Sequence, residues 1–260
     1  MLLALDVGNT QIFGGVWDAE ELKLTFRKSS QKSASSDELG VFLRGVLRES
    51  GLPADAVDAV ALCSVVPDLQ HTLRNCCLKY FKTEPFVLGP GTKTGLAIRY
   101  KNPAEVGADR IANAIAAVHR HPGRDLIVID LGTANTFCAV SRNKEYLGGL
   151  ILPGLGISME ALAQRTAKLP VVEIVRPTEL VGKTTVSSIQ SGLFYGNLAA
   201  LKEITRQIKA GCFKSDDAKV LGTGGFSRLF AEEGVFDEVV PDLVLRGLAI
   251  AFRANAQAAS

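Results

Sequence analysis

The sequence predicts an α/β protein in which two related domains face each other across a central cleft. The first observation is an internal echo, because residues 3–13 (LALDVGNTQIF) and residues 127–137 (IVIDLGTANTF) align without a gap. The second observation is the alternation of helical and strand-like stretches along the chain. Since the echo is displaced by close to half of the 260 residues, we expect an N-terminal domain at residues 1–115 and a C-terminal domain at residues 116–260.

Each copy of the echo predicts a buried strand, a tight Asp-x-Gly turn and a second strand that returns beside the first. Apolar periodicity predicts helices at residues 37–50, 110–121, 158–164, 185–210 and 242–258, and short apolar runs predict strands at residues 59–64 and 85–88. Residues 26–36 are rich in Ser and Lys, which indicates an exposed loop. The glycines of residues 148–156 indicate a turn that connects the domains.

Composition excludes several classes of protein. A net charge of +2 without a run of like charges argues against nucleic-acid and anionic-membrane partners. Asp6 interrupts the apolar N-terminus, which argues against a signal peptide, and no apolar stretch is long enough for a transmembrane helix. The five cysteines show no C-x-x-C spacing, so we expect reduced thiols and a cytoplasmic protein.

The paired Asp-x-Gly turns suit a phosphate group and its divalent ion. Glycine lets the backbone approach an anion, exposed N–H groups donate to phosphate oxygens, and an aspartate such as Asp6 can hold Mg²⁺ directly or through water. A single turn of this kind is more typical of a β-hairpin without a ligand, since Asp, Asn and Gly favour turn conformations. Two copies in the same sequence frame favour a clamp on a polyphosphate.

These turns resemble the two phosphate loops of the actin and sugar-kinase superfamily, and the chain as a whole is similar to the type III pantothenate kinases. The motifs that carry the resemblance are Asp6-Val7-Gly8-Asn9-Thr10, Gly107-Ala108-Asp109-Arg110, Asp130-Leu131-Gly132-Thr133-Ala134-Asn135-Thr136, Gly149-Leu150-Ile151-Leu152-Pro153-Gly154, Gly182-Lys183-Thr184-Thr185 and Gly222-Thr223-Gly224-Gly225. The resemblance implies two actin-like (ribonuclease H-like) domains. It also implies a homodimeric kinase that phosphorylates pantothenate with ATP and Mg²⁺, the first step of coenzyme A biosynthesis.

The resemblance also implies roles for individual residues. The ATP phosphates would contact the first loop, Asp6, Val7, Gly8, Asn9, Thr10, Gln11, Ile12 and Phe13, together with Thr133 of the second loop. Asp109 matches the proton acceptor, and Asp130 matches the ligand of a monovalent cation, potassium or ammonium. Pantothenate would contact Tyr100, Gly107, Ala108, Asp109 and Arg110, and Thr185 would reach it from the neighbouring subunit.

Two positions depart from the pattern of the family, Gln11 where Asn or Arg is expected and Asn135 where Thr is commoner. Both side chains keep their hydrogen-bonding capacity, so the departures bear on nucleotide affinity more than on the type of reaction. The segment Gly222–Gly225 suits a passage for adenine or a loop without a ligand, and we leave it outside the expected site.

Simpler structural roles stand beside these functions. Asp109 suits the first turn of a helix, Arg110 a solvent-facing helix position, Tyr100 an edge strand and Thr185 the N-cap of a helix. The function also has alternatives, namely another small-molecule kinase of the superfamily or a nucleotide-binding regulator of transcription. An attacking alcohol needs alignment and a group that accepts its proton, and the intact Asp109 favours the kinase.

Overall fold

The computed structural model describes residues 1–214 and 217–256, and it has an α/β fold with two mixed sheets. The chain forms two compact units. The first contains Met1–Gly95, Lys101–Ala116 and the last helix, and the second contains Leu96–Tyr100 and Ala117–Asp242.

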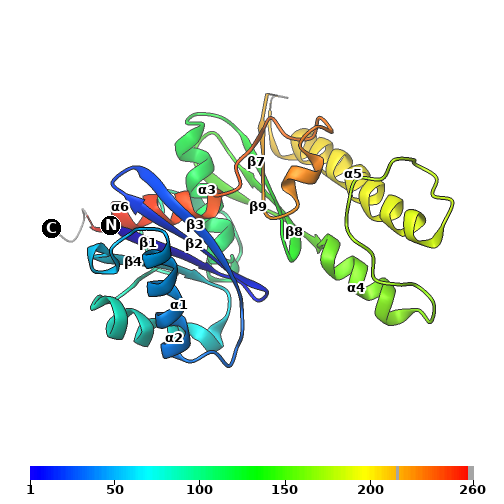
Figure 1. Ribbon diagram of the computed structural model, residues 1–260. Helices are drawn as coiled ribbons and strands as arrows, with labels where there is room; N and C mark the ends of the chain where they lie inside the picture. Colours follow the sequence, from blue (N-terminus) through cyan, green and yellow to red (C-terminus); the bar gives the residue numbers. More distant parts are fainter. Residues whose placement is uncertain (215–216, 257–260) are drawn as a thin grey trace. The chain divides into compact units, whose positions relative to one another are not determined.

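The first unit contains a five-stranded sheet in the order β3-β2-β1-β4-β5. Its strands are β1 (Leu2–Val7), β2 (Gln11–Asp18), β3 (Glu21–Ser29), β4 (Ala59–Ser64) and β5 (Phe86–Val87), and its helices are α1 (Ser36–Glu49), α2 (Gln70–Cys76) and α6 (Leu243–Ala256). The apolar faces of α1 and α2 share one core cluster with β1, β2 and β4 (Figure 1). This core anchors the carboxyl end of β1, where the first Asp-x-Gly turn begins.

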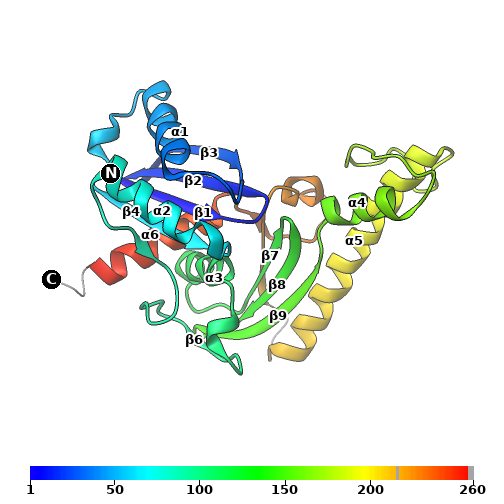
Figure 2. The ribbon, with the colours of Figure 1, turned by 90° about the horizontal axis from the view of Figure 1, so that it is seen from below.

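The second unit contains a six-stranded sheet in the order β11-β10-β7-β8-β9-β6. Its strands are β6 (Ala97–Ile98), β7 (Leu126–Leu131), β8 (Ala134–Val140), β9 (Glu145–Pro153), β10 (Lys219–Thr223) and β11 (Glu238–Val239), and its helices are α4 (Leu155–Arg165) and α5 (Thr185–Cys212). Helix α3 (Ala108–Arg120) begins in the first unit. Helices α4 and α5 lie side by side (Figure 2).

Short helical turns complete the assignment. They are the 3₁₀ turns η1 (Ala54–Ala56), η2 (Pro67–Leu69), η4 (Pro103–Glu105) and η5 (Ser227–Phe230), and the π-helical turn η3 (Cys77–Phe81). Within the described ranges, every helix is too short or too polar to cross a membrane.

The two sheets share one topology. The order β9-β8-β7-β10-β11 in the second unit repeats the order β3-β2-β1-β4-β5 in the first, with β6 added at the edge beside β9. In both units the strand that carries the Asp-x-Gly turn is central, pairs antiparallel with the next strand, and pairs parallel with a strand much later in the chain. The sequence-based prediction of an α/β, actin-like fold is confirmed.

Parts of two segments predicted as a loop and a turn are strands. Residues 26–29 belong to β3, which alternates exposed and half-buried positions, and the ring of Phe26 lies where a side chain on Gly14 would overlap it. Residues 148–153 belong to β9, which pairs along its length with β8. The prediction relied on the Ser and Lys of the first segment and on the glycines of the second. β3 exposes every other residue, and β9 exposes residues 149–151 in succession.

The last helix packs with the first unit. Phe252 of α6 contacts Phe86 of β5 with ring centroids 5.9 Å apart, and the Arg246 guanidinium lies 5.6 Å from the centre of the Trp17 ring. The expected continuation of this helix to residue 258 lies partly outside the described residues. The domain division at residue 115 stays a prediction, beside the observation that α6 belongs to the first compact unit.

Candidate active site

The first Asp-x-Gly turn closes the hairpin of β1 and β2. Val7 pairs with Ile12, and the Gly8 N–H donates to the Gln11 carbonyl at 2.9 Å, which leaves Asn9 and Thr10 exposed at the corner. Ser30 braces this corner, since its N–H donates to the Thr10 carbonyl at 2.9 Å and its hydroxyl to the Gly8 carbonyl at 2.6 Å. The turn is therefore exposed to a ligand and held in shape from the end of β3.

The side chain of Gln11 is held by a neighbouring cation. Arg27 donates from Nη1 to Gln11 Oε1 at 3.3 Å, and its guanidinium lies 4.0 Å above the centre of the Phe13 ring. The chain thus supplies an arginine beside the turn from β3. Sequence reasoning missed Arg27 because it falls in the segment that was predicted to be a loop.

The second turn is one residue shorter than the first. Leu131 pairs with Asn135, and the Gly132 N–H donates to the Ala134 carbonyl at 3.2 Å, with Thr133 exposed at the corner. The gapless alignment of the two echoes is therefore wrong after the turn. Asp6 lies opposite Phe13, whereas Asp130 lies opposite Thr136.

Asp130, on β7, packs against the glycine-rich segment after β10. Gly224 has φ +86°, a conformation that favours glycine, and a side chain built there would overlap Asp130 Oδ1. The segment Gly222–Gly225, left outside the expected site, therefore touches one of its predicted residues. Its glycines were the available sequence signal, but only the pairing of β10 with β7 places them beside Asp130.

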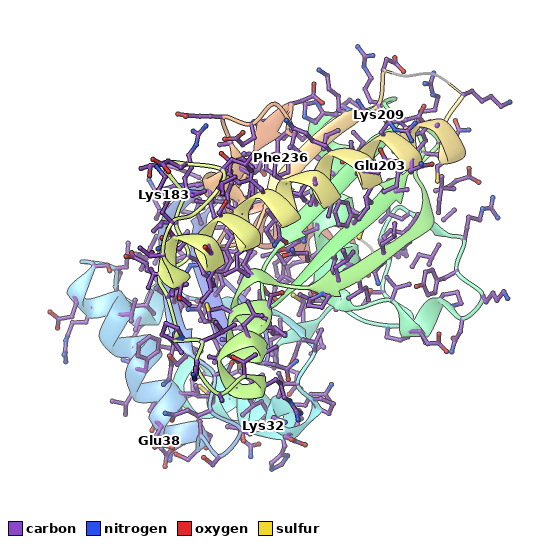
Figure 3. The ribbon with its side chains drawn as sticks, turned by 90° about the vertical axis from the view of Figure 1, so that its right-hand side faces the viewer. Lys32, Glu38, Lys183, Glu203, Lys209 and Phe236 are labelled. Atoms are coloured by element: carbon purple, nitrogen blue, oxygen red, sulfur yellow. The ribbon has the colours of Figure 1, made fainter. Side chains whose placement is uncertain are left out.

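Asn135 binds α5 in this structure. The side chain is buried, and its Nδ2 donates to Asn197 Oδ1 at 2.8 Å, while Asn197 Nδ2 donates to the Leu193 carbonyl at 2.7 Å. This departure from the family pattern therefore connects β8 to the middle of a long helix. Figure 3 shows α5 between Lys183, just before its start, and Lys209, near its end.

A carboxylate–thiol contact lies next to the first turn. The Cys63 thiol on β4 donates to Asp6 Oδ1 at 3.1 Å. Burial, the Asp6 carboxylate and then the charge of Asp109 raise the pKa of Cys63 well above its ordinary value. The structure therefore brings the predicted Mg²⁺ ligand Asp6 and the predicted base Asp109 into one neighbourhood, around a cysteine that sequence reasoning did not select.

Asp109 lies in the first turn of α3. A side chain built on Gly107 would overlap Asp109 Oδ1 and would lie 3.8 Å from Val65 Cγ1, so the carboxylate occupies the space above Gly107. Burial raises the pKa of Asp109, although the Arg110 N–H and guanidinium and the Asp109 N–H favour its ionised form. Asp109 therefore has the helix-start position that was its simpler structural role. Its raised pKa also suits it to take up a proton.

Arg110 is buried, with 5% of its surface exposed, so it does not occupy the solvent-facing helix position that was its alternative. Its charge beside Asp109 is among the causes that favour the ionised carboxylate. A buried guanidinium at this position can receive a planar anion such as a carboxylate. Ala108, which lies between Gly107 and Asp109 in the sequence, is the first residue of α3.

Tyr100 and Thr185 belong to the second unit. Tyr100 follows edge strand β6, and its ring centroid lies 6.4 Å from that of Tyr146, which is buried on β9. Thr185 is exposed at the first position of α5. The N-cap of this helix is Thr184, whose hydroxyl accepts a hydrogen bond from the Ser187 N–H at 3.1 Å. The N-cap role considered for Thr185 is therefore wrong. A groove of about 850 Å³ includes both threonines and the apolar side chains Leu162, Leu169, Ile189 and Leu193.

The donor set of the first turn fits a nucleotide triphosphate with Mg²⁺. Mg²⁺ in such sites is held by one or two carboxylates together with phosphate oxygens, and Asp6 is the carboxylate at the turn. Gly8 keeps the backbone open at this point, because a side chain there would lie 3.2 Å from the Gln11 carbonyl oxygen. The exposed amide and hydroxyl of Asn9 and Thr10 can donate to phosphate.

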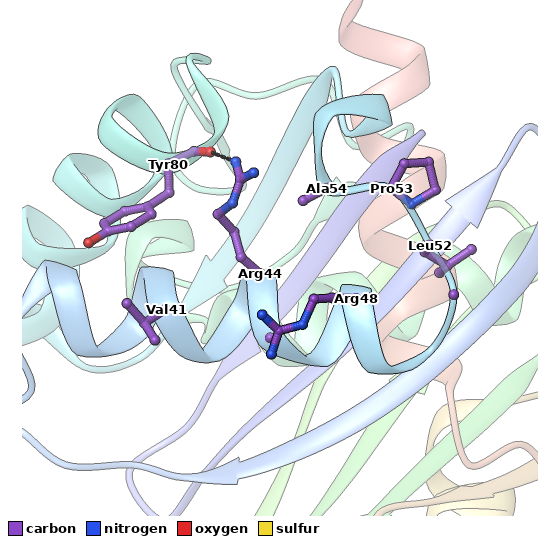
Figure 4. A pocket seen from close by; sticks show the side chains of 9 residues that line it. Val41, Arg44, Arg48, Leu52, Pro53, Ala54 and Tyr80 are labelled. Carbon is purple, nitrogen blue, oxygen red and sulfur yellow. Dashed lines mark hydrogen bonds between the residues drawn. The ribbon is translucent and has the colours of Figure 1, made fainter.

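A hollow of about 680 Å³ on the outer side of α1 includes none of these residues (Figure 4). Its Arg44 donates to the Tyr80 carbonyl at 3.0 Å and pairs with Asp55 at 3.2 Å, and its Arg48 pairs with Glu49. These arginines already have partners on the surface of the helical layer. The hollow is therefore not part of the candidate active site.

Comparisons with known proteins show the family of this chain. The family model of the type III pantothenate kinases matches residues 2–207. A type III pantothenate kinase of Legionella pneumophila (strain Paris) is 53% identical over 98% of this chain and 99% of its own, and one of Elusimicrobium minutum (strain Pei191) is 53% identical over the same shares.

One solved structure supports the fold. It is a Campylobacter jejuni protein described as a Baf family transcriptional activator, with a TM-score of 0.62, 20% identity, and coverage of 98% of this chain and 99% of its own. An identity of 20% shows the fold alone. The family model and the relatives at 53% identity show that this chain belongs to the type III pantothenate kinase family, whose members phosphorylate pantothenate in coenzyme A biosynthesis.

Proposed function

We propose that Asp6 and Asp109 of the first unit carry the chemical step, with Asp6 assigned to Mg²⁺ and Asp109 to the proton of the attacking alcohol. The observation that supports this assignment is that both carboxylates lie close enough to the Cys63 thiol to raise its pKa. Two half-buried carboxylates near one thiol are costly unless a cation or a proton neutralises part of their charge. A kinase of this family uses ATP with a divalent metal ion, which supplies that cation and neutralises phosphate charge.

In the proposed step, Asp109 accepts the proton of the primary hydroxyl of pantothenate. The hydroxyl oxygen forms a bond to the γ-phosphorus, and the bond from that phosphorus to the bridging oxygen of ADP breaks. The raised pKa of Asp109 suits this task, because a base is most effective when its pKa approaches the working pH. The buried Arg110 is assigned to the carboxylate of pantothenate, and Gly107, Ala108 and Tyr100 to its remaining contacts.

The two turns are proposed to bind the phosphates of ATP. Residues 6–13 supply the first turn, including the backbone around Gly8 and the exposed side chains of Asn9 and Thr10, and Thr133 supplies a hydroxyl from the second. Arg27 beside Gln11 adds positive charge to the first turn and compensates for the departure from the family pattern.

Asp130 is proposed to hold a monovalent cation, potassium or ammonium. Its contact with Gly224 supports a fixed position for the carboxylate, since no side chain at residue 224 can push it away. Carboxylate and carbonyl oxygens are suitable ligands for a hard cation of this kind. The role is separate from that of Asp6, which is assigned to the divalent ion.

We further propose a homodimer in which Thr185 reaches the pantothenate of the neighbouring subunit. The start of α5 and its surroundings expose several large apolar side chains, namely Ile157, Val171, Leu180, Val181 and Val186. Val171 and Val181 are each 74% exposed. Exposed large apolar side chains of this kind are typical of a protein–protein interface. The capping role of Thr184 leaves Thr185 outside the cap, which supports its use as a contact.

A cytoplasmic location is proposed as well. The five cysteines are thiols, four of them buried, which suits a reducing compartment.

The assay that tests the function measures ATP consumption with and without pantothenate, first in potassium and then in sodium. We expect consumption that depends on pantothenate and is faster in potassium. Consumption driven equally well by a panel of sugars would support a different kinase of the superfamily. If no acceptor increased ATP consumption, the proposed kinase activity would be contradicted.

A further inference from the structure

The starting observation is the contact between Cys63 and Asp6. Cys63 is fully buried, with 0% of its surface exposed, and its Sγ lies 3.1 Å from Asp6 Oδ1. The two residues are direct partners in the parallel pairing of β1 with β4, in which Leu5 pairs with Leu62 and Val7 with Ser64. The contact is therefore set by the register of two central strands rather than by a flexible surface side chain.

A carboxylate that binds a metal ion works best when its orientation is set in advance. Hydrogen bonds from neighbouring groups hold such ligands in one rotamer, and their loss lowers metal affinity even though the ligand itself remains. Here the donor is a thiol that water cannot replace, because its position is closed to solvent. The reaction steps assigned above leave Cys63 without a role of its own.

We propose that Cys63 is a positioning residue for Asp6: its thiol holds Oδ1 so that the carboxylate keeps one orientation toward Mg²⁺ and the phosphates of ATP. The proposal rests on the assignment of Asp6 to Mg·ATP. It explains a polar contact that directly follows an apolar run in β4, since residues 60–62 are Val, Ala and Leu.

The side chain at this position also has to satisfy a second neighbour. The charge of Asp109 reaches the thiol as well, so a side chain that only accepts hydrogen bonds would face two carboxylates. A thiol is small, donates one hydrogen bond and packs like an apolar group. Serine keeps the donor in a smaller and more polar side chain, and alanine removes it, so the two substitutions separate hydrogen bonding from packing.

The experiment measures binding of a non-hydrolysable ATP analogue with Mg²⁺ by calorimetry, together with kinetics and thermal unfolding. Loss of an orienting partner of a metal ligand costs about 10–100-fold in affinity, and we expect about tenfold weaker binding for Cys63→Ala because a thiol is a weak donor. Cys63→Ser should recover most of the affinity. The KM for pantothenate should stay near the parent value. Cys76→Ala, which removes another buried thiol of the first unit, should bind the analogue like the parent.

A double-mutant cycle separates this proposal from the one on which it rests. If Cys63 acts through Asp6, Cys63→Ala should weaken binding by less than about twofold in an Asp6→Asn background, because interacting residues are not additive. The positioning role would be overturned if Cys63→Ala weakened binding of the analogue equally in both backgrounds. It would also be overturned if Cys63→Ala and Cys63→Ser lost equal affinity and that loss simply followed their unfolding temperatures. Unchanged binding in Asp6→Asn itself would remove the assignment of Asp6 and the role of Cys63 with it. If Asp6→Asn binds the analogue weakly and Cys63→Ala binds it like the parent, the assignment of Asp6 stands and only the positioning role of Cys63 is overturned.

Discussion

The carboxylate of Asp109 occupies the space that a side chain on Gly107 would fill. The atom in conflict is the end of a side chain rather than backbone, so an added methyl group can be accommodated if the carboxylate turns away. Glycine at residue 107 therefore serves the position of the proposed base more than the stability of the helix.

Gly107→Ala should lower kcat by about 10–100-fold, because misplacing a reacting group by about 1 Å costs on this scale. The unfolding temperature should change little. Gly45→Ala is the matched control, since a side chain at that position in α1 meets nothing within 4 Å and alanine favours a helix. An unchanged kcat for a folded Gly107→Ala protein would mean that the orientation of Asp109 is unimportant.

Asp109→Asn should lower turnover with pantothenate by about 10²–10⁴-fold while ATP binding stays nearly intact, because it removes a base and preserves size. In the parent, kcat should fall as pH decreases through the pKa of Asp109. Burial raises that pKa, so the fall should occur above the ordinary aspartate value of about 3.9. Normal turnover in this variant would exclude Asp109 as the base.

The raised pKa of Asp109 also predicts that the Asp109→Asn variant is more stable than the parent at neutral pH. A raised pKa in the folded state means that the protonated carboxyl favours folding below the unfolded-state pKa of about 3.9, and that this contribution is lost as pH rises through the folded-state pKa. Asp109→Asn should therefore unfold at a higher temperature than the parent at about pH 7, with a gain that shrinks toward about pH 3. Thermal unfolding across this pH range measures it, and a variant that is less stable at neutral pH would contradict the cost of ionising Asp109.

The two echo aspartates should respond to different ions. Asp6→Asn should raise the KM for Mg·ATP by about 10–100-fold, the range expected when a contact worth about 1.5–3 kcal/mol to a charged group is lost. Asp130→Asn should mainly reduce activation by potassium. Titrations of Mg²⁺ and of potassium for each variant test this separation. Potassium activation of Asp130→Asn equal to that of the parent would show that Asp130 is not the cation ligand.

A shared active site can be tested by complementation. Thr185→Ala should raise the KM for pantothenate and leave that for ATP nearly unchanged. When an inactive Asp109→Asn chain is combined with a chain inactivated by a bulky substitution at Thr185, mixed dimers should regain activity, because one of their two sites then has both native residues.

The design requires proof that mixed dimers form, which native mass spectrometry supplies after co-expression. Activity per mixed dimer near half that of the parent would support a site built from two subunits. If mixed dimers are confirmed and no activity returns, each site is built within one chain and the proposal for Thr185 is wrong.

Local patterns in the sequence were enough to predict the elements that hold the first turn. Strand β4 was predicted at residues 59–64, as observed, and α1 was predicted one residue later at each end than its observed bounds, Ser36–Glu49. The echo predicted both Asp-x-Gly hairpins, because an apolar strand followed by Asp and Gly specifies a buried strand and a tight turn within a few residues. The family, and with it the reaction, also followed from the order of short motifs along the chain.

Only the tertiary structure decided which distant segments meet. Asp6 and Cys63 are 57 residues apart and touch because β1 pairs with β4. Gly224 reaches Asp130 because β10 pairs with β7. The exposed faces of β3 and β9 carry serine, lysine and glycine, so their strand character depends on hydrogen bonds to β2 and β8 that no local pattern contains. Turns and strand periods are set by neighbours in sequence, whereas strand register and the contacts of buried polar groups depend on pairing between segments far apart in the chain.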